Sequence, residues 1–348
     1  MKDILQGIFD TWISEEVEDF SGVLSVAGDD GVIYSKAVGH RNIAEELPNT
    51  LDTAFAIASG TKLFTGLAVC KLINEGKLSL DAKLCDILAY DLGQIDKRVT
   101  VYQLLTHTSG VGDYVDEDAE DFDAQLQALY NKYPVQLWER LEYYLQMITP
   151  LAPKFEPNER FGYSNSGYVL LGLVVEAVSG ISFQQFVKEK IIDPCGLLHT
   201  GFYRMDCLPQ NAALGYIEHE ETGQWRTNAY SLPIVGGADG GIYSCAADMD
   251  KLWRAIFANK ILSKAMTEVI FKSHIITDED EDTVESYGLG IYQYCEGDKK
   301  LYYIMGVDSG VGFISCYYPA TKVVASSFCN IGYKGASLFF DELLEILG

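Results

Sequence analysis

Strand-like segments lie at the two ends of this chain, and helical patterns fill the stretch between them. Near the N-terminus, residues 20–26 and 32–38 are apolar runs that flank Gly28-Asp-Asp-Gly31, a sequence typical of a hairpin turn. This order predicts an α+β fold in which both ends of the chain join one antiparallel sheet. Near the C-terminus, three further runs have strand-like character: residues 300–305, 312–318 and 322–330.

The middle of the chain is predicted to be helix and polar loop. An apolar helix begins at Ser59 and runs to about Asn74, with Gly76 as its stop. We expect the first and last helices of the chain to cover the sheet. The further helices that the apolar pattern predicts are residues 1–13, 167–178, 246–258 and 335–347.

These patterns predict a single domain over residues 1–348, built from two lobes. Residues 1–58 and 285–348 form the sheet lobe, and residues 59–284 form a mainly helical lobe. The chain has 348 residues, of which 48% are hydrophobic, so it is long enough to bury a sizeable core. The helix that begins at Ser59 lies at the junction of the lobes, where clefts usually occur, and the active site is expected there.

The net charge of −24 limits the partners that the protein can bind. Nucleic acids and anionic membrane surfaces would repel it, so we expect neither as a partner. Two acidic clusters, residues 116–123 and 278–285, lack the spacing of a calcium loop and are predicted to be solvated loops rather than metal sites.

Cysteine and histidine usage predicts a protein without metal or cofactor. The eight cysteines are scattered without a Cys-x-x-Cys pair, which favours buried thiols in a reducing compartment over a disulfide framework. The five histidines are equally scattered and give no zinc-site spacing. The N-terminus shows no secretory leader and no apolar run is long enough to span a bilayer. We therefore expect a cytoplasmic location.

The pair Ser59 and Lys62 carries the clearest chemistry in the sequence. A spacing of three on a helix puts the hydroxyl and the amine on one face, one turn apart. An activated serine nucleophile needs a base within hydrogen-bond reach, and this spacing provides one. The alternative is a chance pair, because Ser-x-x-Lys is expected about once in a chain of this length from ordinary residue frequencies.

A second candidate group is Tyr163-Ser164-Asn165, at the start of the helix predicted at 167–178. A phenolate beside the Lys62 ammonium could act as general base, because a nearby positive charge lowers the pKa of a tyrosine. The structural alternative is a helix cap, in which Ser164 or Asn165 caps the helix and Tyr163 packs against it.

Ser59-Gly-Thr-Lys62 together with Tyr163-Ser-Asn165 resembles the serine β-lactamase and penicillin-binding protein superfamily. The branch it resembles most holds the class C β-lactamases, related serine esterases and D-aminopeptidases. The resemblance implies the β-lactamase/transpeptidase-like fold, with an antiparallel sheet, flanking terminal helices and a helical lobe. It covers most of the chain through further similar segments: Leu104-Leu-Thr-His-Thr-Ser-Gly110, Gly172-Leu-Val-Val-Glu-Ala-Val-Ser-Gly180, Pro194-Cys-Gly-Leu-Leu-His-Thr200, Gly240-Gly-Ile-Tyr-Ser-Cys-Ala-Ala-Asp248 and Tyr287-Gly-Leu-Gly290.

The resemblance also implies a role for each residue of these motifs. Ser59 would attack a carbonyl and form an acyl-enzyme, and its backbone N–H would be one half of the oxyanion hole. Lys62 would accept the serine proton or tune Tyr163 electrostatically. Tyr163 would act as base in acylation and would activate the deacylating water. Asn165 would orient Lys62 and the substrate amide.

The third motif of this superfamily, normally Lys-Thr-Gly or His-x-Gly, is altered here. Counting back from Gly312, the basic position falls on Gly306, the motif glycine falls on Asp308, and Ser309 supplies the second oxyanion N–H. A gapped alternative makes residues 308–310 the motif, and Asp308 as a solvent-facing turn residue is the structural alternative. Because Asp308 would repel a substrate carboxylate, we expect a neutral ester, or a substrate with a free amine, to fit better than an anionic β-lactam.

Other catalytic motifs are missing from the sequence. It holds no Gly-x-Ser-x-Gly and no P-loop, and we expect His107 to be a hydrogen-bonded structural residue. The glycine-rich run 236–241 is predicted to be a tight turn near the cleft floor, and the loops around 112–133 and 212–233 are expected to set specificity.

The sequence as a whole predicts a serine hydrolase that acts on a small ester, amide or peptide, as an esterase or D-aminopeptidase-like amidase. One alternative is a β-lactamase or D-alanyl-D-alanine carboxypeptidase. An alternative of another class is a catalytically silent member that binds a ligand or partner. The sequence does not indicate an oligomeric state.

Overall fold

The computed structural model describes residues 7, 11, 20–117, 119, 121–219 and 222–332. The C-terminal helix expected at 335–347 lies outside the described residues. The N-terminal helix expected at 1–13 lies outside them too, apart from Gly7 and Thr11.

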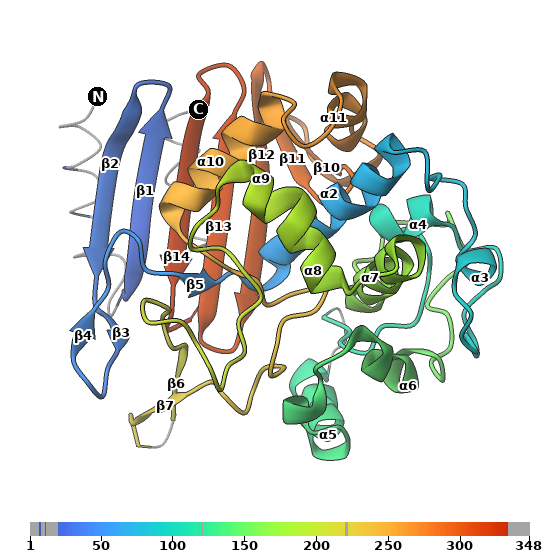
Figure 1. The fold of residues 1–348 in the computed structure, drawn as a ribbon, viewed down its shortest axis with the longest axis horizontal. Coiled ribbons are helices and arrows are strands. Elements are labelled where there is room, and N and C mark those ends of the chain that lie inside the picture. Colours follow the sequence, from blue (N-terminus) through green and yellow to red (C-terminus); the bar gives the residue numbers. More distant parts are fainter. Residues whose placement is uncertain are drawn as a thin grey trace.

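One eight-stranded antiparallel sheet organises the molecule (Figure 1). Its strand order is β2-β1-β14-β13-β12-β11-β10-β9, so the N-terminal hairpin pairs with the last strand of the chain, with Gly22 opposite Cys329. The prediction that both chain ends join one antiparallel sheet is confirmed. The strands are β1 (Gly22–Gly28), β2 (Gly31–Val38), β9 (Ile275–Glu279), β10 (Thr283–Tyr287), β11 (Tyr292–Glu296), β12 (Lys299–Asp308), β13 (Val311–Tyr318) and β14 (Val323–Cys329).

The sheet also extends over three strands that the sequence analysis did not predict. β9 and β10 form a hairpin from the acidic segment 278–285, which was expected to be a solvated loop, so that prediction was wrong. The expected lobe boundary at residue 285 falls inside β10. The reason is physical: β9 is an edge strand, and charged side chains are common on edges because they discourage pairing with other chains.

Short two-stranded ladders complete the β structure. They are β3 (His40–Asn42) with β4 (Leu47–Pro48), β5 (Phe55–Ala56) with β8 (Tyr243–Ser244), and β6 (Tyr216–Glu218) with β7 (Trp225–Thr227).

The three central helices lie where the apolar pattern predicts them, at α2 (Thr61–Asn74), α7 (Asn165–Ser179) and α10 (Ala246–Phe257). Gly76 adopts positive φ, as its predicted role as a helix stop requires, and Gly180 does the same at the end of α7. The remaining helices are α3 (Leu84–Ile87), α4 (Val101–Leu105), α5 (Phe122–Lys132), α6 (Leu145–Ile148), α8 (Phe183–Val187), α9 (Asp193–Cys195) and α11 (Lys264–Ile270). The short helical turns are η1 (Ala58–Gly60), η2 (Val135–Leu137), η3 (Leu141–Tyr144) and η4 (Lys188–Ile192).

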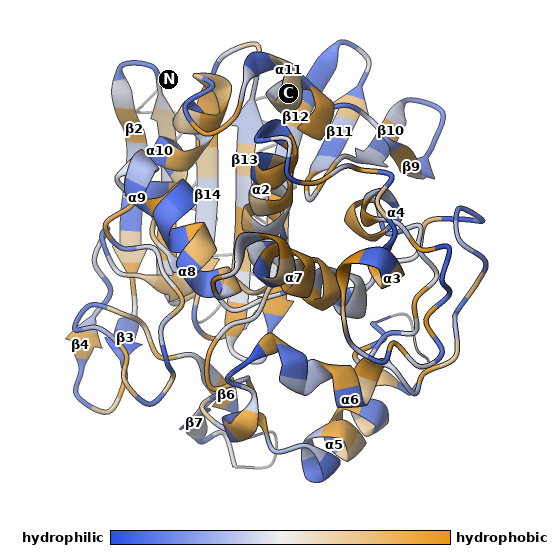
Figure 2. Cartoon of the chain, turned by 45° about the vertical axis from the view of Figure 1, so that its right-hand side comes forward, coloured by the Kyte–Doolittle hydropathy of each residue, from blue (hydrophilic) through white to orange (hydrophobic). Residues whose placement is uncertain are grey.

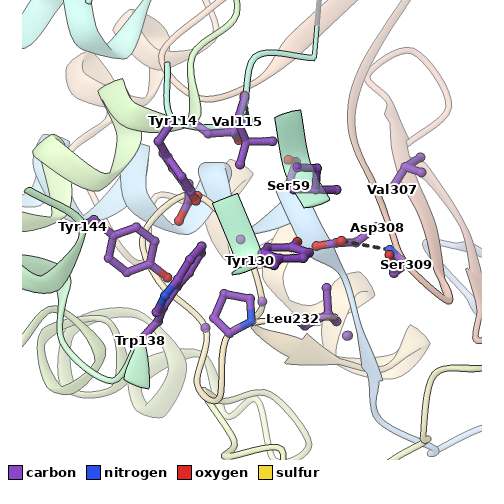
Figure 3. A pocket seen from close by; sticks show the side chains of 18 of the residues that line it. Ser59, Tyr114, Val115, Tyr130, Trp138, Tyr144, Leu232, Val307, Asp308 and Ser309 are labelled. Atoms are coloured by element: carbon purple, nitrogen blue, oxygen red, sulfur yellow. Dashed lines mark hydrogen bonds between the residues drawn. The ribbon is translucent and has the colours of Figure 1, made fainter. Parts of the chain in front are cut away.

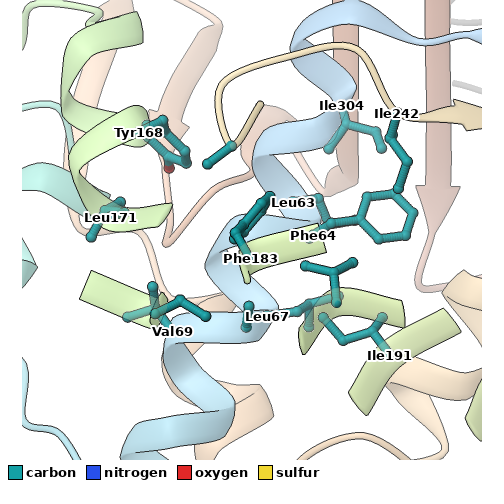
Figure 4. Packing of buried hydrophobic residues seen from close by; sticks show 14 of the residues in the cluster. Leu63, Phe64, Leu67, Val69, Tyr168, Leu171, Phe183, Ile191, Ile242 and Ile304 are labelled. Carbon is teal, nitrogen blue, oxygen red and sulfur yellow. The ribbon is translucent and has the colours of Figure 1, made fainter. Parts of the chain in front are cut away.

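Helix α2 runs through the centre of the core, between the sheet and helices α7 and α8 (Figure 1). Leu63, Phe64 and Leu67 are fully buried, and Figure 4 shows them surrounded by side chains from α7, α8 and β12. Apolar residues dominate α2 and α7 along their lengths (Figure 2). A helix that is apolar on all sides is stable only when buried, so α2 gives Ser59 and Lys62 a rigid support.

The described residues contain neither a disulfide bond nor a single helix that could span a membrane. All eight cysteines are free, and four of them are buried: Cys70, Cys245, Cys316 and Cys329. Within the described ranges, no single helix has the length and hydropathy to cross a membrane; only the bent pair formed by α7 and the segment Phe183–Cys195 meets those criteria when taken together.

Candidate active site

A pocket of about 390 Å³ opens between the helical lobe and the sheet, at the junction where the active site was expected. Figure 3 shows Ser59 on one side of it, together with Val307 and Asp308 of β12 and the following turn residue Ser309. The loops expected to set specificity supply part of the opposite wall, including Tyr114 and Leu232. Among the described residues, no group of three or more His, Cys, Asp or Glu side chains is arranged to hold a metal ion.

Ser59 and Lys62 meet as the helical spacing predicts. Ser59 lies in η1, directly before α2, and Lys62 lies in the first turn of α2. The Lys62 ammonium donates hydrogen bonds to Ser59 Oγ at 2.9 Å, to Asn165 Oδ1 at 2.8 Å and to the Asp239 carbonyl at 2.8 Å. Lys62 is only 2% exposed, so its three protons are all directed within the site.

Burial lowers the pKa of Lys62 below its ordinary value, because removing water penalises the charged form. Four carboxylates act against this effect, those of Asp239, Glu117, Asp113 and Asp308. The lower pKa makes the neutral amine more accessible, which suits Lys62 to accept a proton from Ser59.

Tyr163 lies beside this pair, with Lys62 Nζ 4.7 Å from the centre of its ring. The Lys62 charge was expected to lower the pKa of Tyr163, and this expectation was wrong. Burial raises the pKa of Tyr163 well above 10, Glu117 raises it further, and the hydrogen bond with Ser59 lowers it only in part. The site therefore favours a neutral phenol that relays a proton over a phenolate that acts as base.

The sequence left open whether Tyr163-Ser164-Asn165 belongs to the site or caps a helix, and the segment does both. Ser164 Oγ accepts a hydrogen bond from Gly167 N–H at 3.0 Å and caps α7. Asn165 Oδ1 accepts a hydrogen bond from the Lys62 ammonium, and the Asn165 side-chain N–H donates to Glu117 Oε1 at 2.9 Å. Capping fixes the start of the helix, and this directs Asn165 into the site.

His107 is a structural residue, as predicted. It is fully buried, and its Nδ1 accepts a hydrogen bond from Ser164 N–H at 3.0 Å. Its ring packs against Tyr163 with 4.6 Å between the centroids. Burial lowers the pKa of His107 well below its usual value, so the ring stays neutral and remains an acceptor for that N–H.

The altered third motif lies on β12 beside Ser59. A Cβ at Gly306 would lie 2.2 Å from the Ile57 carbonyl oxygen and 2.7 Å from Ser59 N, so the strand approaches Ser59 most closely at Gly306. Asp308 and Ser309 line the pocket. The Ser309 N–H, expected as the second oxyanion donor, donates to Asp308 Oδ1 at 2.8 Å in this structure.

Three acidic residues of the site were missed by the sequence analysis as functional groups. Asp239 holds Lys62 through its carbonyl, and its carboxylate accepts a hydrogen bond from the Tyr114 hydroxyl. Asp113 accepts the N–H groups of Asn165 and Ser166 at the start of α7, both at 2.8 Å.

Glu117 is the third, and it corrects the prediction for the acidic cluster 116–123. That segment was expected to be a solvated loop, yet Glu117 lines the pocket and α5 begins at Phe122. The glycine-rich run 236–241 does lie at the pocket, as predicted, and Thr65 Oγ1 of α2 donates to the Ala238 carbonyl at 2.6 Å.

A side chain at Gly306 is expected to damage both the fold and the site. In Gly306→Ala the added carbon meets backbone atoms of Ile57 and Ser59, which cannot move aside as the end of a flexible side chain can. We expect a loss of about 1–3 kcal/mol in the free energy of unfolding, as for other overpacked sites, together with reduced turnover because Ser59 shifts. Urea unfolding and an esterase assay measure both effects.

The matched control is Gly28→Ala. There the added carbon meets only the end of the Ile33 side chain, at 3.2 Å. Equal stability of the two variants would contradict the close approach between β12 and η1.

The buried carboxylates predict that stability falls as the pH rises toward neutral. Burial raises the pKa of Asp113 from 3.8 to about 7, and it raises that of Asp239 too. A group whose pKa is higher in the folded state contributes stability that is full below its unfolded pKa and is lost as the pH rises through its folded pKa. Thermal unfolding at constant ionic strength should therefore give a higher Tm near about pH 5 than near about pH 7.5. A higher Tm at the neutral pH would contradict this electrostatic account.

The chain is similar in sequence to a known protein family and to known penicillin-binding proteins. The model of the Beta-lactamase family matches residues 9–347. Penicillin-binding protein 4* of Bacillus subtilis is 29% identical over 296 residues, which cover 82% of this chain and 62% of that protein. The chain thus spans less than two thirds of the length of this curated relative.

Solved structures share the fold over nearly the whole chain. A penicillin-binding protein from Bacillus halodurans superimposes with a TM-score of 0.87 at 38% identity, covering 99% of this chain and 100% of the other. A D-amino acid amidase from Ochrobactrum anthropi SV3 superimposes with a TM-score of 0.80 at 22% identity, covering 99% and 97%. The second likeness shows the fold alone. The first combines fold and sequence similarity, and the expected β-lactamase/transpeptidase-like fold is confirmed.

Proposed function

Because the chain belongs to the β-lactamase family, whose characterised members are serine hydrolases, we propose that it forms an acyl-enzyme at Ser59 and hydrolyses small esters or amides. One observation carries the proposal: the buried Lys62 amine lies 2.9 Å from Ser59 Oγ, on a rigid helix, at the wall of a pocket. A nucleophile with a base in hydrogen-bond reach is the minimal requirement for covalent catalysis.

The proposed reaction has two halves. In acylation, Ser59 Oγ bonds to the substrate carbonyl carbon and its proton passes to the Lys62 amine. The bond to the leaving group then breaks, and that proton reaches the leaving group through the Tyr163 hydroxyl. In deacylation, water attacks the acyl carbon and gives its proton to the Tyr163–Lys62 relay. The bond between the acyl carbon and Ser59 Oγ then breaks, and the relay returns the proton to Ser59 Oγ, which releases the acid and restores the serine hydroxyl. The Ser59 N–H, near the start of consecutive helical segments, is the first oxyanion donor.

Esterase or D-aminopeptidase-like amidase activity is the first choice, and small esters or amides are the favoured substrates. The basic residue of the third motif is missing, and the pocket carries acidic side chains, so a substrate carboxylate has no cationic partner among the lining residues.

The second candidate is a β-lactamase or D-alanyl-D-alanine carboxypeptidase. The similarity to the penicillin-binding proteins of B. subtilis and B. halodurans favours it. A catalytically silent member remains the alternative of another class, and the intact Ser59, Lys62 and Asn165 contacts argue against it.

Turnover of three chromogenic substrates tests these choices. We expect hydrolysis of p-nitrophenyl acetate and of an amino acid p-nitroanilide, and slow or no hydrolysis of nitrocefin, whose carboxylate meets the acidic pocket. Fast nitrocefin hydrolysis would favour the second candidate. No turnover of any of the three would favour the silent member.

A further inference from the structure

Acidic side chains outnumber basic ones in the lining of the pocket. Of the described residues that line it, three are acidic, Glu117, Asp239 and Asp308, and none is Lys, Arg or His. Lys62 lies behind the wall and already donates its protons to Ser59, Asn165 and the Asp239 carbonyl. Within the part of the chain that the structure describes, the Lys62 amine is therefore already engaged by the catalytic residues.

Each of these carboxylates accepts a hydrogen bond from an uncharged donor. Glu117 accepts from the Asn165 amide, Asp239 from the Tyr114 hydroxyl, and Asp308 from Ser309 N–H. Each carboxylate has about four acceptor positions, so these bonds leave further capacity. A cation in the pocket would face three acceptors held at one place.

Asp308 is the carboxylate best placed to meet a substrate group near the scissile bond. It lies two residues after Gly306, the point where β12 approaches Ser59 N. Residues two apart on a strand share a face and lie about 7 Å apart. Figure 3 shows the Asp308 side chain directed into the pocket toward Tyr130. Asp308 is exposed to solvent at this edge, so an incoming substrate can reach it.

The wall opposite Asp308 is aromatic. Tyr114, Tyr130, Trp138 and Tyr144 all line the pocket, and their ring centroids lie between 5.2 Å and 6.1 Å from one another in the pairs that touch. The Trp138 indole N–H is buried and has no hydrogen-bond partner. Aromatic faces beside carboxylates attract organic cations and also accept a large apolar side chain.

We propose that the pocket selects substrates whose acyl group bears a primary ammonium close to the scissile carbonyl, with Asp308 as its main partner and the aromatic wall around the neighbouring side chain. This inference rests on the proposed hydrolase function and narrows it to esters or amides of free amino acids, or to peptides with a free N-terminus. Glu117 and Asp239 add to the attraction, since each lies in the same pocket.

Three p-nitroanilides of one amino acid test the inference: the free amine, the N-acetyl form and the N-succinyl form. Each is assayed as both enantiomers. We expect kcat/KM to be highest for the free amine and lowest for the anionic succinyl form. The ratio between free amine and N-acetyl should be at least about tenfold, the effect of one partly desolvated ion pair. In Asp308→Asn that ratio should fall by about tenfold.

Glu117→Gln is the second variant, and it should lower the ratio in the same direction by less. Asp298→Asn removes an exposed acid in the turn before β12 and serves as the matched control, with an unchanged ratio. Covalent labelling of Ser59 by a fluorophosphonate, measured in every variant, reports the nucleophile separately. Labelling without preference for the free amine would overturn this inference and leave the hydrolase proposal standing. If both labelling and turnover are absent, both proposals fail.

Discussion

Replacing Ser59 by alanine should abolish turnover and leave the fold intact. The substitution removes the only atom proposed to bond to the substrate, so kcat/KM for p-nitrophenyl acetate should fall by at least about 10⁴-fold, as for other nucleophile deletions. The serine side chain lies at the pocket and its loss creates no core cavity, so the Tm should change little.

Ser79→Ala is the matched control, because Ser79 is exposed near the end of α2. It should retain full activity. Residual activity in Ser59→Ala above about one tenth of the wild type would mean that hydrolysis uses another nucleophile or none.

The second large effect is expected for Lys62→Met, which keeps an unbranched apolar side chain, one atom shorter than that of lysine, and removes the amine. General base catalysis contributes about 10²–10⁴-fold, and we expect a loss near the upper end because no other base contacts Ser59 from α2. The remaining rate should lose the rise with pH that deprotonation of Lys62 causes in the wild type. Because the pKa of Lys62 is lowered by burial, that rise should be centred below 10.5.

Tyr163→Phe separates the two candidate bases. If the phenol relays a proton, its removal should cost less than the removal of Lys62, about 10²-fold in kcat. A larger loss in Tyr163→Phe than in Lys62→Met would assign the base role to Tyr163. Lys77→Met, an exposed lysine that pairs with Glu75 on the surface, is the control for loss of a lysine and should have no effect on the rate.

The fold followed from the sequence where patterns are local. The hairpin at Gly28-Asp-Asp-Gly31 and the glycine stop of α2 each depend on a few neighbouring residues, and both are confirmed. β9 and β10 were missed because the edge of the sheet needs no apolar periodicity, so charge alone suggested a loop. β10 pairs with β9 on one side and with β11 on the other, so the acidic segment became part of the sheet although its residues are charged.

In the candidate site, too, local contacts could be predicted from the sequence and long-range contacts could not. The contact between Ser59 and Lys62 follows from helical spacing and could be predicted. The contact of Lys62 with Asp239 joins residues that lie 177 positions apart, and no local pattern indicates it. The pKa of Tyr163 was predicted in the wrong direction because the sequence shows a neighbouring charge but not the burial that outweighs it.

The central claim is that Ser59 is an activated nucleophile. Its most direct test is intact-protein mass spectrometry after exposure to a fluorophosphonate, with peptide mapping and Ser59→Ala beside the wild type. The account predicts a single phosphonyl adduct on Ser59 that is absent from the variant. An unmodified wild type, or an adduct that persists in Ser59→Ala, would contradict it.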